Sequence, residues 1–84
     1  MKCSSLKEVK ICEGLKQIES GTFNSCEKLE KIELPLSLEI ISIAAFFESN
    51  NLKTVIYNGT QQDRNKIIIW ELNDPLINAD WIYK

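Results

Sequence analysis

Apolar residues recur along this chain with one fixed period, defined by the equal spacing of Leu6, Leu29 and Leu52. Five further apolar columns keep the same period without insertion or deletion. Those columns are Val9/Ile32/Val55, Ile11/Leu34/Tyr57, Leu15/Leu38, Ile18/Ile41 and Phe23/Phe46. A fixed period of this length, which we call the repeat period, predicts a solenoid, in which each coil has an apolar face that only its neighbouring coils can bury.

The spacing within one coil predicts its local structure. Val9 and Ile11 lie two positions apart, which is typical of one face of a short strand, here over roughly residues 8–12. A second inward stretch runs from Leu15 to Ile18, and Phe23 closes the coil after a Gly-Thr turn. Stacked coils would place equivalent strands side by side, ~4.8 Å apart, in a parallel sheet.

These columns resemble the BspA-type leucine-rich repeat. The resemblance is carried by Cys3-x-x-Leu6-x-x-Val9-x-Ile11, by Gly14-Leu15-x-x-Ile18-x-x-Gly21-Thr22-Phe23-x-x-Cys26, and by Leu34-Pro35-x-Ser37-Leu38 in the second unit. It implies an α/β fold: a short right-handed leucine-rich-repeat solenoid, mostly parallel β with tight turns and a small C-terminal cap helix. It also implies a non-catalytic protein-interaction module of a surface or secreted adhesion-type protein. The alternative is a structural C-terminal cap of a longer array with no binding role of its own.

The period divides the chain into a single repeat domain over residues 1–84. We predict repeat one over residues 3–25, repeat two over 26–48, a half repeat over 49–57 and a C-terminal cap over 58–84. At the other end the first strand would have a bare edge and an open slice of core. Either the chain is the C-terminal end of a longer array, or this edge pairs with another copy in a homo-oligomer.

The cap departs from the repeat. Thr60 and Asp63 have the spacing of a capping box and predict a short helix over roughly 61–66. An apolar strand-like run over 67–70, a turn over 73–75 and a last strand over 79–83 follow. Arg64 stands where members of the family often carry tryptophan. We interpret Trp70 and Trp81 as packing residues of the cap.

The polar residues between the inward columns are expected to line the concave sheet face, which in leucine-rich repeats is the usual contact surface. Their charges alternate from coil to coil, which predicts a self-neutralised ladder that fixes the strand register. The functional alternative is a mixed-charge protein-contact patch, with Pro35 and Leu36 as further apolar points. The candidate contact residues are Lys7, Glu8, Lys10, Glu30, Lys31, Glu33, Lys53, Thr54 and Ile56.

Composition excludes several other functions. The 84 residues hold 10 Lys+Arg against 12 Asp+Glu, a net charge of -2, which gives no support to a nucleic-acid or anionic-membrane partner. No segment approaches the ~20 apolar residues of a membrane span, and the first residues do not resemble a signal peptide, although the resemblance implies an extracellular or cell-surface parent protein. Histidine is absent, which removes Ser-His and Cys-His relays. We therefore expect no enzymatic activity, no metal and no cofactor.

The three cysteines lack the paired spacing of a zinc site. We interpret Cys3, Cys12 and Cys26 as free, partly buried thiols, with a disulfide between Cys3 and Cys26 as the alternative, since the two are one coil apart. The Asn58-Gly59-Thr60 stretch fits a glycosylation acceptor but is interpreted as a plain turn.

Overall fold

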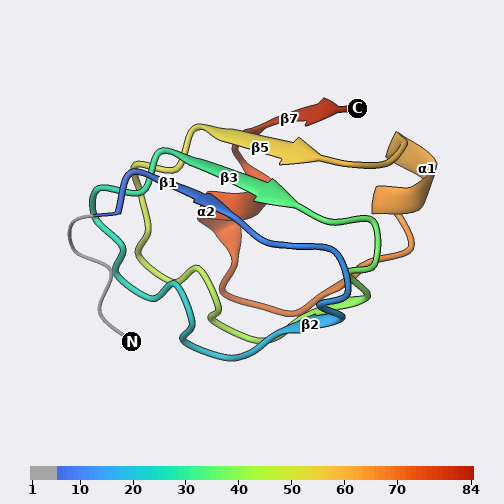
Figure 1. Ribbon diagram of the computed structural model, residues 1–84. Coiled ribbons are helices and arrows are strands. Elements are labelled where there is room, and N and C mark those ends of the chain that lie inside the picture. The colour runs from blue at the N-terminus through green and yellow to red at the C-terminus, as the bar shows by residue number, and fades with distance from the viewer. Residues whose placement is uncertain (1–5) are drawn as a thin grey trace.

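The computed structural model describes residues 6–84, which form the expected solenoid of parallel strands (Figure 1). Two sheets enclose the core, one with the strand order β1-β3-β5-β7 and the other with the order β2-β4-β6. In chain order the elements are β1 (Glu8–Lys10), β2 (Gln17–Ile18), β3 (Lys31–Leu34), β4 (Ile40–Ile41), β5 (Thr54–Tyr57), α1 (Gln61–Arg64), β6 (Ile68–Ile69), α2 (Asp74–Ile77) and β7 (Asp80–Tyr83).

The strand register follows the repeat period of the sequence. In the four-stranded sheet Val9 lies opposite Ile32, and Ile32 lies opposite Val55, each one period further along the chain. In the three-stranded sheet Ile18 lies opposite Ile41 with the same offset. Each coil therefore contributes one strand to each sheet, as the apolar columns predict.

The inward columns form one hydrophobic core. Ile32, Leu34, Ile41, Val55 and Phe46 are completely shielded from solvent. Phe46 also stacks on the phenylalanine of the preceding coil, Phe23, with ring centroids 5.1 Å apart. The coils are thus joined by direct packing of equivalent side chains. Burial raises the pKa of the Tyr57 hydroxyl in the same core.

The first coil is less well covered than the second. Leu6 and Leu15 are 41% and 42% exposed, whereas Leu29 and Leu38, their equivalents one coil on, are buried. Val9 and Ile11 are half-buried. Val9 and Ile11 pack against the core as predicted, whereas Leu6 and Leu15 do not belong to it. Within the described residues the first coil has a neighbour on one side only.

Polar side chains of one coil form hydrogen bonds with backbone groups of the neighbouring coil. The Glu13 carboxylate accepts hydrogen bonds from the N–H groups of Leu36 and Ser37 in the next coil, at 2.8 and 3.3 Å. The Ser37 hydroxyl donates back to the carbonyl of Leu15 at 2.8 Å. Deeper in the core, the fully buried Ser49 hydroxyl accepts from the N–H of Cys26 and donates to the carbonyl of Phe23. These bonds supply partners to backbone groups that lie outside the short strands.

The cysteines differ from the interpretation as free, partly buried thiols. Cys26 is fully buried and disulfide-bonded. Cys12 is a free thiol but is exposed, because it follows the end of β1 in the turn toward Gly14. Cys3 lies outside the described residues, as does the first part of the predicted first repeat.

A left-handed backbone position recurs in every coil. Gly21, Ala44 and Leu72 have φ angles of 73°, 58° and 63°. Gly21 and Ala44 lie one repeat period apart, and Leu72 follows Ala44 at the same offset that separates Ile40 of β4 from Ile68 of β6. Since only the first of the three is glycine, the turn geometry of the coil imposes this conformation on residues that do not favour it.

The cap continues the solenoid with a longer period. β6 pairs with β4, and β7 pairs with β5 with Trp81 opposite Val55, so a third coil is completed. The extra length holds α1, whose capping box between Thr60 and Asp63 is present as expected. Hydrogen bonds from the backbone and side chain of Thr60 lower the pKa of the Asp63 carboxyl. The expected helix over 61–66 is confirmed but ends earlier, at Arg64.

The end of the cap differs from the expectation in two places. The expected turn over 73–75 is instead the start of α2, with Pro75 in its first turn and Leu76 fully buried. Trp70 does not pack in the cap, because Ile69 faces the core and Trp70, the next residue, is 54% exposed. Trp81 does pack against the core, and its indole N–H donates to the Leu76 carbonyl at 3.0 Å.

Arg64 and Trp81 close this end of the core. The guanidinium carbon of Arg64 lies 4.2 Å from the centre of the Trp81 ring. A cation–π contact of this kind is worth about 0.5–2 kcal/mol and keeps the arginine stem on apolar surface. Arg64 is therefore part of the cap packing.

Candidate functional site

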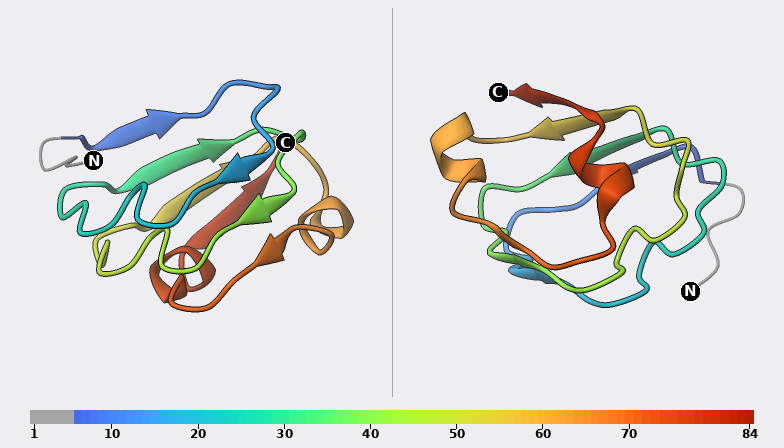
Figure 2. Two further views of the ribbon diagram at one scale, coloured as in Figure 1. Left: turned by 90° about the horizontal axis from the view of Figure 1, so that it is seen from below. Right: turned by 180° about the vertical axis from the view of Figure 1, so that it is seen from behind.

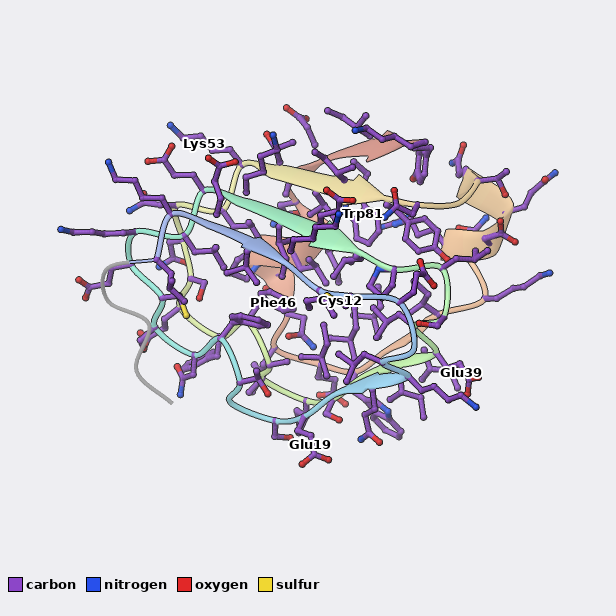
Figure 3. All side chains as sticks on the ribbon, viewed as in Figure 1. Cys12, Glu19, Glu39, Phe46, Lys53 and Trp81 are labelled. Carbon is purple, nitrogen blue, oxygen red and sulfur yellow. The ribbon has the colours of Figure 1, made fainter. Side chains whose placement is uncertain are left out.

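The outward side chains of β1, β3 and β5, together with the residues that precede these strands, form one continuous surface. We call this surface the ladder face and define it by the nine candidate contact residues Lys7, Glu8, Lys10, Glu30, Lys31, Glu33, Lys53, Thr54 and Ile56. In Figure 3, Lys53 extends outward on the sheet side of the molecule, and Glu19 and Glu39 lie on the opposite side. The sheet places these side chains in columns, because outward positions alternate with the inward core positions along each strand.

The columns bring opposite charges next to each other. Glu8 lies opposite Lys31, and Lys10 lies opposite Glu33. The Lys31 ammonium is 3.7 Å from the Glu8 carboxylate, and this is the one ion pair of residues 6–84. Both partners are exposed, so the pair contributes ~1 kcal/mol or less.

Glu33 is held by an amide rather than by a lysine. The side-chain NH2 of Asn58 donates to the Glu33 carboxylate at 3.0 Å. This hydrogen bond lowers the pKa of Glu33, and the positive charges of Lys10, Lys84 and Lys31 act in the same direction. Asn58 therefore helps to position a charged group of this face, although its sequence context suggested only a turn.

The ladder face is hollowed in two places. One hollow of about 360 Å³ is lined by Lys7, Glu8, Glu30, Lys31, Lys53 and Thr54. A second of about 330 Å³ is lined by Glu8, Val9, Lys10, Lys31 and Glu33. Eight of the nine candidate residues line these hollows, so the structure gathers them on one surface.

Ile56 is the exception, because it is only 6% exposed. It lies outside the core cluster, in the central strand β5, and its register partners Glu33 and Ile82 flank it on β3 and β7. The expectation that Ile56 is an exposed contact point is therefore wrong. Pro35 is buried as well, whereas Leu36 is 51% exposed.

Two further residues extend the ladder face beyond the sequence-based set. Asp80 lies opposite Thr54, and Ile82 lies opposite Ile56 and is 47% exposed. The sequence predicts a last strand over 79–83, but the repeat period does not assign its register. Trp81 follows Val55 at a longer offset than the repeat period. A search for strand pairing that allowed any offset would have assigned the register of this last strand.

A charge reversal tests the ladder. Glu30→Lys is expected to lower the free energy of unfolding by about 1 kcal/mol more than Glu30→Gln, because a lysine there would lie between Lys7 and Lys53. Urea denaturation of the two variants measures the difference. Equal stabilities would remove the charge ladder as an explanation of this face.

Glu27 provides the matched control. It is exposed and lines a polar hollow beside Glu48 on another part of the surface. A lysine at this position would not lie between two other lysines. Glu27→Lys is therefore expected to be at least as stable as Glu27→Gln.

Residues 6–84 contain no group of three His, Cys, Asp or Glu side chains that could hold a metal ion. In the same part of the chain no helix has the length and hydropathy to span a membrane.

Comparison with known proteins identifies a family model for most of the chain. A model described as the BspA type leucine rich repeat region (6 copies) matches residues 1–68. The match ends within β6, before α2 and β7. No curated protein and no solved structure matches the chain.

Proposed function

Because the chain belongs to the BspA-type leucine-rich-repeat family, we propose that it is a non-catalytic protein-interaction module of a surface or secreted adhesion-type protein. Repeats of this family are generally protein-interaction modules and typically non-catalytic, and proteins that carry them are often surface-associated. The contact surface in this proposal is the ladder face. Both hollows on the four-stranded sheet, and the polar side chains that line them, support this choice.

The charged groups of the ladder face carry the proposal. Within residues 6–84 only Glu8 and Lys31 form an ion pair. The charged groups of Lys7, Glu30 and Lys53 form no ion pair with a described residue. Their backbones are fixed by the parallel sheet, so a partner would have to order only the side chains and not the backbone.

The balance of charge defines the chemistry of the partner. The four lysines of the face are matched by three glutamates and by Asp80 of the neighbouring strand. Lys84, which follows β7, adds one positive charge near Glu33. A surface with so little net charge does not strongly attract the phosphates of nucleic acid or an anionic membrane. It fits a protein surface that carries both signs, which the alternating columns would select by complementarity.

Differential capture tests this proposal. The wild-type chain and the variant Glu30→Gln/Lys53→Gln are immobilised and exposed to proteins released from cell surfaces by mild proteolysis. The variant keeps the net charge, creates no like-charge pair and lies within the larger hollow. We expect the bound protein to be retained at least tenfold less by the variant.

The matched control is Glu27→Gln/Lys28→Gln, which makes the same change outside the ladder face. It should capture as much as the wild-type chain. A protein retained equally by all three chains would overturn the ladder face as the contact surface.

The second candidate function is that of a structural cap. It is favoured by the closed C-terminal end, where Leu76 is fully buried and Arg64 covers Trp81. A cap would stabilise and solubilise a longer array, and other repeats would bind the partner. In the capture experiment a cap retains no protein above the level of a blank surface.

A further inference from the structure

The β1 end of the solenoid presents both a strand edge and apolar side chains. Among residues 6–84, β1 has β3 on one side and no strand on the other (Figure 2, left). Leu6 and Leu15 are exposed at this end, and a hollow of about 260 Å³ is lined mainly by apolar side chains, among them Ile11, Ile18 and Phe23. An uncovered edge of this kind is a template for pairing with another strand.

The backbone bonds of β1 show which groups are available for pairing. The Lys7 carbonyl accepts from the N–H of Glu30 at 2.8 Å, and the N–H of Ile11 donates to the Glu33 carbonyl at 3.0 Å. Residues 7, 9 and 11 therefore direct their backbone groups toward β3. Because these directions alternate along a strand, the N–H and C=O groups of Glu8 and Lys10 point away from the sheet.

Charge selects one antiparallel register for two copies of this edge. A two-fold axis at Val9 places Glu8 of one copy opposite Lys10 of the other, twice per dimer. These are also the residues with outward backbone groups, so each pair can exchange two N–H···O=C bonds. An axis at Glu8 or at Lys10 would instead place like charges opposite each other.

The alternative, in which coils of two copies stack head to tail, is disfavoured by charge. Continuing the parallel register of the sheet beyond β7 would place Asp80 opposite Glu8 of the next copy. At the C-terminal end α2 and Arg64 on Trp81 also cover the core, while β7 remains an edge strand. A closed two-fold dimer meets neither obstacle.

The end face of the solenoid is small, because the extents of the molecule are 30 × 22 × 21 Å. A contact confined to such a face belongs to the smaller specific interfaces, and we expect the dimer to dissociate on dilution.

From these observations we propose that the chain forms a two-fold homodimer in which the β1 strands pair antiparallel about Val9. The pairing joins the two four-stranded sheets into one continuous sheet and covers the apolar end of each core. It does not depend on any partner at the ladder face, and its test uses different residues from those of the capture experiment.

Charge-reversal variants test the proposal by sedimentation of the full chain over a concentration series. The wild-type chain should change from monomer to dimer with rising concentration and form nothing larger. Glu8→Lys and Lys10→Glu should each weaken self-association about tenfold or more, because each creates two like-charge pairs in the dimer. An equimolar mixture of the two variants should recover the wild-type affinity, since the heterodimer again pairs opposite charges.

The mixture also controls for folding, because a variant that had lost its structure could not restore association. A wild-type chain that stays monomeric up to millimolar concentration would overturn the proposal. So would a series of growing oligomers strengthened by Glu8→Lys, since that result would indicate head-to-tail stacking through Asp80.

Discussion

Phe46→Ala is expected to lower the free energy of unfolding by about 3–5 kcal/mol. The Phe46 ring is completely buried and stacks on Phe23 at 5.1 Å, so its removal leaves a cavity between two coils. A domain of this size has a total stability of about 5–15 kcal/mol, and the variant should be largely unfolded at moderate urea concentration. Urea denaturation followed by tryptophan fluorescence or circular dichroism measures the loss.

Phe47→Ala is the matched control for this prediction. Phe47 is the next residue in the chain, has the same side chain and is 39% exposed. We expect its substitution to cost no more than about 1 kcal/mol, since part of the ring already contacts water. A melt of Phe46→Ala that matches that of Phe47→Ala would contradict the assignment of Phe46 to the core.

Most of the repeat fold could be predicted because one physical constraint acts on every coil. A side chain that faces the core in one coil must meet its equivalent in the next, so Ile32, Val55 and Phe46 had to be apolar at fixed spacing. The first two coils obey this constraint with no change of length. Their strands and register follow directly from the sequence.

The third coil could not be predicted as well, because its length differs. The insertion of α1 moves β6 further along the chain than the repeat period predicts, and β7 also returns late, with Trp81 opposite Val55. One repeat period after Leu38 the chain has the polar Gln61, and the period assigns no register to Ile82. The burial of Ile56 was missed for the same reason, since Ile82 flanks it from β7.

The division of the chain into two repeats, a half repeat and a cap remains a prediction of the period. The parallel pairing of β6 with β4 supports a description of β5 and β6 as the strands of a third, longer coil, and β7 adds one further strand beside β5. In the third coil one side chain takes the place of a backbone contact that joins the first two coils. That side chain belongs to Asn73.

Asn73→Ala is expected to lower the free energy of unfolding by about 2–4 kcal/mol, although the residue is polar and lies at the start of a short helix. In the preceding coil the N–H of Phe23 donates to the backbone carbonyl of Ala45 at 2.8 Å. The equivalent N–H of Phe46 donates instead to the side-chain oxygen of Asn73, at 2.9 Å. The side-chain NH2 of Asn73 donates in turn to the carbonyls of Ser42 and Trp70, at 2.9 and 2.8 Å.

Removal of this fully buried amide takes the partner from the Phe46 N–H and from the Trp70 carbonyl, whereas the Ser42 carbonyl keeps its hydrogen bond from the Ala45 N–H. Each buried, unpaired group costs about 1–3 kcal/mol before water or local shifts compensate. Asn78→Ala is the matched control, because Asn78 follows α2 at an exposed position; its substitution should change stability by no more than about 0.5 kcal/mol. Thermal and urea unfolding of both variants measure the difference. If Asn73→Ala were as stable as Asn78→Ala, the closure of the third coil would depend on apolar packing by Leu76 and Trp81 alone, and the amide would have no structural role.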